Sequence, residues 1–257
     1  MNWREQYVAF MTIVRKEIKR YLRIWTQTLL PSAITMSLYF VIFGSLIGSR
    51  IGDMGGFTYM EFVVPGLIMM AIVTNSYSNV VSSFFGSKFS HSVEELLVSP
   101  VSNVVILMGY VVGGVSRGLL VAVVVTIVSL FFTHLQIHSY FIVVAVVLMT
   151  STLFALAGFI NAVYANSFDD ISIVPTFVLT PLIYLGGVFY SMDLLPEFWA
   201  NVSKINPLVY VVNAFRYGVL GVSDVSLPLA FGMIVFFTVL AFAFSMHLLN
   251  SGKRLRQ

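Results

Sequence analysis

Long, uninterrupted apolar stretches constrain this chain more than any other feature of its sequence. Six stretches approach the roughly 20 residues that a helix needs to cross a bilayer: 27–48, 59–86, 116–137, 139–163, 171–190 and 227–249. They are continuously apolar rather than alternating, which favours helices over the strands of a barrel. Charged residues make up 10% of the chain, against about 25% in soluble domains. We therefore predict an all-α integral membrane protein, with six transmembrane helices in a single transmembrane domain over residues 1–257.

The basic residues indicate how such a chain is oriented. Eleven Lys and Arg flank one side of the predicted spans: Arg4, Arg15, Lys16, Lys19, Arg20, Arg23, Lys88, Arg117, Lys253, Arg254 and Arg256. The other side has three, namely Arg50, Lys204 and Arg216. The positive-inside rule then predicts that both termini lie in the cytoplasm. Because this placement explains the basic pI of about 9.1, we expect membrane lipid, and no nucleic acid, as a partner.

The first 26 residues are predicted to form an amphipathic helix at the membrane surface. Apolar and aromatic side chains recur at helical spacing, at Trp3, Tyr7, Met11, Val14, Ile18, Leu22 and Trp25, and most of the basic residues fall on the other face. Such a helix suits an anionic leaflet. A helix that only fixes the topology fits the same residues.

A second short helix is predicted in the loop 87–103, between the second and third spans. Ser92 and Glu95 have the spacing of a capping box, Glu94 and Glu95 suit the positive end of the helix dipole, and Pro100 limits the helix. Four apolar residues fall on one face: Phe89, Val93, Leu96 and Leu97. The pattern leaves two interpretations open, a helix packed on the membrane surface and a helix that docks into a cytoplasmic partner.

The segment 191–226, before the last span, is predicted to be an external re-entrant helical hairpin. Asn206 and Pro207 have the pattern of an N-cap followed by proline at the first helical position. The apolar run that follows is only 14 residues long, too short to cross the membrane. Arg216 lies within it and needs the headgroups or a carboxylate, for which Asp193, Glu197 and Asp224 are candidates.

Polar residues inside the spans are the candidates for a translocation path. They are Asn75, Tyr77 and Asn79 in the second span, and Thr176, Thr180 and Tyr184 in the fifth. For any single one of them, hydrogen bonding between helices is the favoured explanation. Glycines at four-residue spacing, such as Gly109 with Gly113 and Gly114 with Gly118, predict close helix packing, either within the chain or between two copies.

The sequence lacks the motifs that would give this chain an ATP site or a metalloprotease site. It has no GxxxxGK[ST] loop for ATP phosphates and no HExxH. It has no cysteine, which excludes thiolate metal sites. His134 and His138 are four residues apart but lack an obvious third ligand, so we predict no metal site. We expect no catalytic residue and no cofactor bound by this chain.

The arrangement resembles the ABC-2 type permeases, the membrane half of bacterial ABC exporters. The resemblance covers the whole length, and its most specific part is PTFVLTPLIYLGGVFYSMDLLPEFWANVSKINPLVYVVNAFRYGVLG, with Pro207, Tyr210 and Arg216 at the expected spacing. IGSRIGDM, FVVPGLIMM and FDDISIVPTFVLTPL also fit the family. Membership implies a protein of the bacterial inner membrane that contains no ATP site of its own.

The resemblance further implies how such a permease works. Two copies are expected to pair as a homodimer, with the path along their interface, and to bind two copies of a separate ATP-binding cassette subunit that holds ATP and Mg²⁺. Residues 1–26 then correspond to the connecting helix. The residues Phe89, Ser92, Val93, Glu94, Glu95, Leu96 and Leu97 form the coupling helix. Two other classes stay open, a secondary transporter driven by an ion gradient and a membrane scaffold that transports nothing. Against the first, the sequence shows no clear inverted repeat and no buried charge pair.

Overall fold

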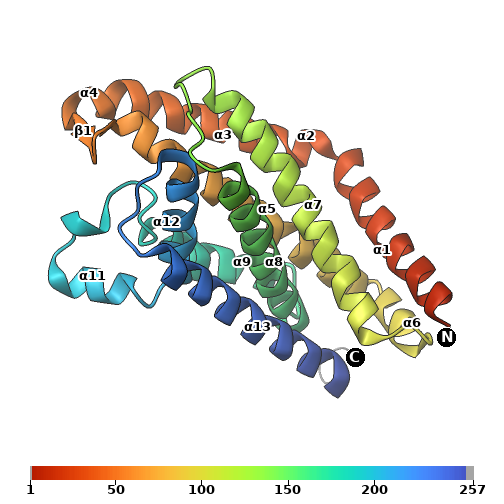
Figure 1. Ribbon diagram of the computed structural model, residues 1–257. Coiled ribbons are helices and arrows are strands. Elements are labelled where there is room, and N and C mark those ends of the chain that lie inside the picture. Colours follow the sequence, from red (N-terminus) through yellow and green to blue (C-terminus); the bar gives the residue numbers. More distant parts are fainter. Residues whose placement is uncertain (1, 253–257) are drawn as a thin grey trace.

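The computed structural model describes residues 2–252, and it is a bundle of long helices (Figure 1). Within these residues, five helices are long and apolar enough to cross a membrane. They are residues Trp25–Gly44, which combine α2 (Trp25–Thr28), α3 (Leu30–Phe40) and the start of the π-helical segment η1 (Val41–Ile47), then α5 (Tyr59–Phe89), α7 (Asn103–Ser129), α8 (Tyr140–Tyr164) and α13 (Leu227–Ser251). The all-α membrane architecture predicted from the sequence is confirmed.

A shorter, composite helix stands in place of the fifth predicted span. It is made of α9 (Asp170–Val174), the π-helical segment η2 (Pro175–Leu179) and α10 (Thr180–Tyr184). Fifteen helical residues extend about 22 Å, less than the hydrocarbon core of about 30 Å. Pro175 and Pro181 lie inside it, and proline removes a backbone donor and disturbs the regular turn. The prediction of six full-length spans is thus confirmed for five helices and stays a prediction for this one.

The remaining elements are α1, which has 21 residues, and several shorter segments. They are α1 (Trp3–Arg23), α4 (Gly48–Ile51), the antiparallel pair β1 (Asp53–Met54) and β2 (Phe57–Thr58), α6 (Ser92–Val98), the 3-10 turn η3 (Met192–Leu194), α11 (Glu197–Ser203) and α12 (Pro207–Leu220). Figure 1 places α6, the start of α1 and the end of α13 at one end of the bundle, with α4, β1 and α11 at the other. The sequence-based prediction put both ends of the chain on one side of the membrane, and this arrangement agrees with it.

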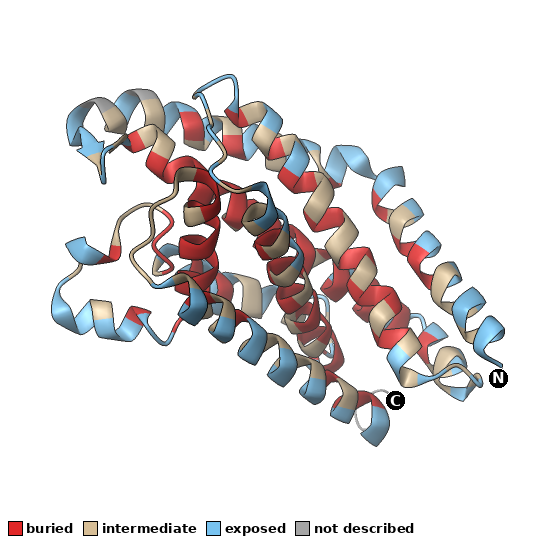
Figure 2. Ribbon diagram, viewed as in Figure 1, coloured by how far each residue is buried: buried red, intermediate tan, exposed pale blue. Residues whose placement is uncertain are grey.

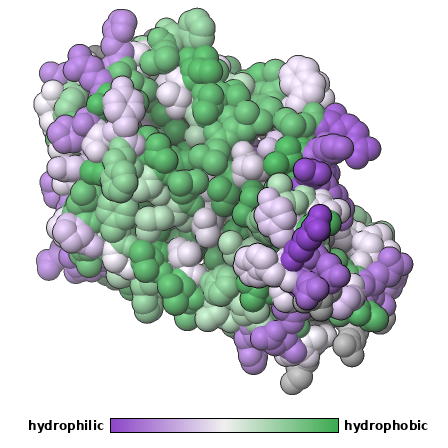
Figure 3. Space-filling view, turned by 45° about the vertical axis from the view of Figure 1, so that its right-hand side comes forward, coloured by the Kyte–Doolittle hydropathy of each residue, from purple (hydrophilic) through white to green (hydrophobic). Residues whose placement is uncertain are grey.

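Burial is concentrated on α5, which runs through the centre of the bundle (Figure 2). In the most apolar 18-residue stretch of α5, 78% of the residues are buried. In the corresponding stretch of α13, 11% are buried. An apolar helix that the protein leaves exposed is expected where lipid is the solvent, because lipid tails are as apolar as the core. Figure 3 shows the consequence, a broad band of hydrophobic side chains between two hydrophilic ends.

Glycine spacing on α7 sets how closely the helices approach. A Cβ added at Gly109 lies 2.6 Å from Ile13 of α1, and one at Gly113 lies 2.6 Å from Glu17. Gly114 packs in the same way against Val80 of α5. The predicted close packing is confirmed for these glycines, and it occurs within the chain.

The start of the third span was predicted wrongly. The helix begins at Asn103 rather than at residue 116, because Gly109, Gly113, Gly114 and Gly118 lower the apparent hydropathy without interrupting the helix. Arg117 therefore lies in the middle of α7 and is buried. It was counted among the charges that flank the spans, and that assignment is wrong.

Candidate functional site

The short helix α6 forms where the sequence predicted it, but its cap differs. His91 occupies the N-cap position with φ of 58°, and Ser92 is the first helical residue. The hydroxyl of Ser92 donates to the carbonyl of Ser87 at 3.1 Å. The predicted capping box of Ser92 and Glu95 is therefore wrong by one position. The helix ends at Val98, and Ser99, before Pro100, is in extended conformation, as expected.

The apolar residues of α6, together with Phe89 at the end of α5, divide between buried and exposed positions. Val93 is 1% exposed and belongs to the core, and Leu96 and Leu97 pack partly against it. Phe89 and Val98 are 62% and 83% exposed, and Glu95 is exposed as well, while Glu94 is half-buried. The predicted ridge thus fixes α6 to its own bundle through Val93. The side chains left to meet a partner are Phe89, Glu95 and Val98.

Phe89 joins α6 to a second loop at the same end of the bundle. Its ring lies 5.0 Å from the ring of Phe168, which is itself 54% exposed. Phe168 also meets Phe85 edge to face at 5.0 Å. Asp170 orders this second loop, because its carboxylate accepts hydrogen bonds from the backbone N–H groups of Asn166 and Ser167 at 2.9 and 3.2 Å. These bonds lower the pKa of Asp170.

Two clamps hold the α6 region against α1 and α8. Gln6 of α1 donates to the carbonyl of Pro100 at 3.1 Å and accepts from the N–H of Ser102 at 3.0 Å. Lys88 donates to the carbonyls of Val163 and Ala165 at the end of α8. Because both ends of α6 are bonded to other helices, a force on α6 reaches α1, α5, α7 and α8 together.

A buried ionic cluster connects α1 with α5. Glu17 is fully buried, accepts a hydrogen bond from Ser83 at 2.5 Å, and pairs with Arg20 at 3.3 Å. Arg20 also donates to the backbone and side-chain oxygens of Asn79, at 2.8 and 2.9 Å. Sequence reasoning missed this cluster, and the expectation that the chain has no buried charge pair is wrong. The available signal was an acid three residues before an arginine on the face that also carries Ile13 and Tyr21.

The path candidates of α5 lie inside the bundle. Asn75 donates to Ser32 at 3.0 Å and accepts from Arg117 at 2.9 Å. Asn79 is fully buried in the cluster with Arg20, and Tyr77 is 2% exposed. These three residues therefore do not form the surface of this chain. Thr74 and Ser78 directly precede Asn75 and Asn79 in the sequence and so lie on a different face of α5. Thr74 is exposed and Ser78 is half-buried, and Ser82, four residues on, is also exposed.

The path candidates of the composite helix lie on the surface. Thr176 and Thr180 are exposed, and Thr180 donates to the carbonyl of Pro175 at 2.9 Å. Tyr184 is 44% exposed, and its ring stacks on that of Phe189 at 5.7 Å. The six candidates are thus not one site, because the helical rotation of α5 could not be resolved from the sequence.

The three residues of the family motif, Pro207, Tyr210 and Arg216, all lie in α12 and make contacts that hold this helix in place. Arg216 is fully buried, donates to the carbonyl of Gly187 at 2.6 Å, and lies over the ring of Phe62 at 3.8 Å. The expected carboxylate partner is not among these contacts: the guanidinium of Arg216 meets a backbone carbonyl and an aromatic ring instead. That expectation is therefore wrong for Arg216. The carboxylate of Asp224 instead accepts from the N–H of Met192.

The other two motif residues, Pro207 and Tyr210, lie in the first turn of α12. Pro207 is the first residue of α12, and Asn206 caps the helix by accepting from the N–H of Leu208 at 2.9 Å. Tyr210 donates to the carbonyl of Lys204 at 2.6 Å. The predicted helix start is confirmed. Gly221, in left-handed conformation, ends the helix, whereas Gly218 lies within it.

No group of three or more metal-ligating side chains occurs within residues 2–252. His138 instead packs edge to face on Tyr217 at 5.4 Å.

Comparison with known proteins identifies the family. The model of the ABC-2 type transporter family matches residues 8–220. The chain belongs to this family. It is 58% identical over 250 residues to the inner membrane transport permease YadH of Escherichia coli K12, covering 97% of this chain and 98% of that protein. It is also 24% identical to nodulation protein J of Neorhizobium galegae, over 100% of this chain and 95% of the relative. This chain is therefore a membrane component of an ABC transporter, and α6 is the part of it to examine for contact with a partner.

Proposed function

We propose that this chain is the permease subunit of an ATP-driven exporter in the bacterial inner membrane, with both termini cytoplasmic. Two copies form a homodimer around the path. Two copies of a separate ATP-binding cassette subunit bind ATP and Mg²⁺ and act on α6. The family and the similarity to an inner membrane transport permease support the class. The lack of a phosphate-binding loop in the sequence is the reason to expect the ATPase on another chain.

The observation that carries the proposal is the exposed apolar surface at the α6 end. Phe89, Val98 and Phe168 are all more than half exposed. α6 lies at the end of the bundle where α1 begins, and Arg4 in the first turn of α1 is an exposed cation. A soluble partner that covers these side chains removes apolar surface from water, at about 25 cal/mol per Å². The clamps of Gln6 and Lys88 then transmit its movement to the spans, which gives alternating access.

The homodimer and its path are proposed from the polar surface residues. Thr74, Ser78 and Ser82 repeat every four residues along α5, and Thr176 and Thr180 lie on the exposed side of the composite helix. Polar side chains on the outside of a membrane bundle are expected to face a cavity or another helix rather than lipid. We place the second copy, and the path between the copies, against these two helices.

Of the alternatives, the secondary transporter is disfavoured by the placement of acids. Within α5, α7, α8 and α13 the one acidic residue is Glu61, in the first turn of α5, where its carboxylate accepts from the backbone N–H of the N-cap residue Thr58. The buried Glu17 is on α1 and is paired with Arg20. The scaffold stays a candidate, since a non-transporting subunit uses the same docking surface.

The test is to purify the tagged chain in mild detergent, identify the proteins that bind to it, and measure ATP hydrolysis and export. The variants are Phe89→Asp and Val98→Asp. Ile205→Asp is the matched control, because Ile205 is 77% exposed and lies just after α11, which is at the other end of the bundle. We expect the first two changes to lose the cassette subunit and its coupled hydrolysis, with the control unchanged. Binding and export that survive both changes would refute docking at α6. Binding without any transport would favour the scaffold.

A further inference from the structure

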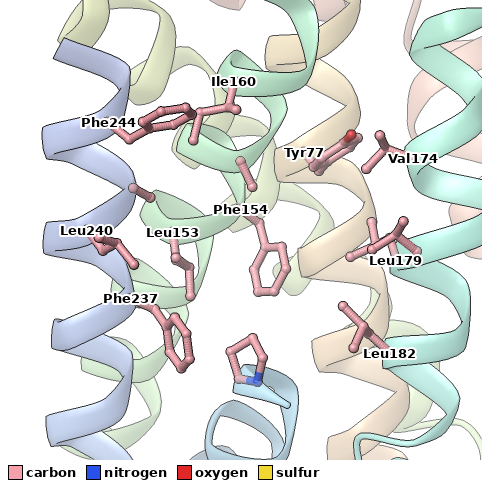
Figure 4. A pocket seen from close by; sticks show the side chains of 14 residues that line it. Tyr77, Leu153, Phe154, Ile160, Val174, Leu179, Leu182, Phe237, Leu240 and Phe244 are labelled. Carbon is pink, nitrogen blue, oxygen red and sulfur yellow. The ribbon is translucent and has the colours of Figure 1, made fainter. Parts of the chain in front are cut away.

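An apolar cavity of about 500 Å³ lies on the flank of the bundle. Figure 4 shows its walls, with α13 on one side, the composite helix on the other, and α8 and Tyr77 of α5 behind. Pro207, at the start of α12, also lines it.

The lining excludes water and charged ligands. Thirteen of the fourteen lining residues have hydrocarbon side chains, among them Leu153, Phe154, Leu182 and Phe237, and the fourteenth is Tyr77. A buried water needs two to four polar partners, and these walls do not provide them. Such a cavity is suited to a hydrocarbon ligand.

The cavity opens on the surface that faces the bilayer. Val178, Leu240 and Phe244 at its edge are 49%, 55% and 40% exposed. Its lining runs from Phe237 to Phe244 along α13 and from Leu153 to Ile160 along α8, which is about 10 Å along each helix. The hydrocarbon core is about 30 Å thick, so this length accommodates most of the chain within one leaflet but no headgroup.

The composite helix separates this cavity from the proposed path. Val174, Val178 and Leu182 line the cavity at four-residue spacing. Thr176 and Thr180 lie between these positions along the helix, do not line the cavity and are exposed. A ligand in the cavity would therefore contact the side of the composite helix that carries Val174, Val178 and Leu182.

We propose that the cavity binds a single hydrocarbon chain of a membrane lipid, which enters sideways from the bilayer between α13 and the composite helix. The chain belongs either to a bilayer phospholipid or to a lipid cargo, since the walls recognise only the methylene chain that both share. This proposal concerns the isolated chain in a membrane and does not depend on the ATPase partner.

The experiment is photolabelling of the full chain in phospholipid vesicles, with a phosphatidylethanolamine that carries a diazirine at the end of one acyl chain. We expect labelling at Leu153 and Leu182 to exceed labelling at Phe236 and Val239, which are on the exposed face of α13. Ala241→Phe fills the cavity from α13. It should lower labelling of Leu153 and Leu182 at least about tenfold. This is the change in binding expected if only two methylene groups of the lipid chain are no longer buried in the cavity. Ala243→Phe is the matched control, because Ala243 is exposed on the same helix and does not line the cavity.

A second filling variant, Ala157→Phe, approaches the cavity from α8 and keeps the test valid if Ala241→Phe does not fold. Labelling of the cavity no stronger than that of the exposed face, or labelling that a folded filling variant leaves unchanged, overturns the proposal. Lipids extracted from the purified wild-type chain distinguish the two sources. Bulk phospholipid identifies a bilayer lipid, and an enriched species identifies a cargo.

Discussion

Removal of the Glu17 carboxylate is the perturbation that best tests the buried cluster between α1 and α5. Glu17 is fully buried, whereas the side chain of its partner Arg20 is 26% exposed. In Glu17→Ala the hydroxyl of Ser83 loses its acceptor and Arg20 loses its counter-charge. In Glu17→Gln the shape stays and an amide oxygen can still accept from Ser83, so the two variants separate charge from packing.

The expected magnitude follows from the contacts. Breaking a buried ion pair by removing one partner costs roughly 3–5 kcal/mol. Arg20 is partly solvated and keeps its bonds to Asn79, which puts Glu17→Ala at the lower end, about 3 kcal/mol. Glu17→Gln retains the hydrogen bond and is expected to cost about 1–2 kcal/mol. The coupling between Glu17→Ala and Arg20→Ala should be about 1–2 kcal/mol, as for groups in direct contact.

The assay is reversible unfolding of the purified chain in mixed detergent micelles, with helix content as the signal. Lys19→Ala is the control, because Lys19 is exposed on the same helix, and it should change the free energy of unfolding by less than about 0.5 kcal/mol. If Glu17→Ala costs less than about 1 kcal/mol, or no more than the control, the cluster does not anchor α1 and the reasoning from burial is wrong.

Three further predictions concern packing, the signature arginine and pH. Gly158→Ala places a Cβ 2.5 Å from the carbonyl oxygen of Tyr77 and should cost about 1–3 kcal/mol, whereas Gly232→Ala, with nothing within 4 Å, should gain about 0.5–1 kcal/mol, both measured by the same unfolding assay. Arg216→Lys keeps the charge but loses the planar contact with an aromatic ring, so we expect a loss of roughly 2 kcal/mol and a lower thermal midpoint; an unchanged midpoint would contradict this role. The pKa of Asp170 is lowered in the folded chain, so its contribution to stability is fully present above the unfolded pKa of about 3.9 and is lost as the pH falls through the folded pKa. Asp170→Asn should therefore destabilise the chain at pH 7 and lose that effect in acid, and an equal effect at both pH values would exclude the carboxylate as the cause.

The helices of the spans were predictable because burial in lipid needs only length and continuous apolarity. α5, α8 and α13 begin and end within a few residues of the predicted bounds. Arg117 and the glycines of α7 lowered the local hydropathy, so the start of that helix was misplaced by 13 residues. Hydropathy does not register that an arginine can be buried against Asn75.

The position of α6 in the sequence was predictable, but the direction in which its apolar face points was not. Pro100 and the apolar spacing located α6 correctly, since both act within a few residues along the chain. The amphipathic pattern could not tell whether the apolar face meets a partner or its own bundle. The structure turns Val93 inward and leaves Val98 exposed.

The sequence by itself determined the membrane, the helical fold and the family, because these depend on composition, on local spacing and on motifs read along the chain. Tertiary structure alone decided which face of each helix is buried. It buried Asn75 and Asn79 and exposed Thr74, it paired Glu17 with Arg20, and it placed Arg216 on Phe62. The physical reason is that a helix in lipid has no polar solvent to orient it. Its rotation is set by contacts with helices far away in the sequence.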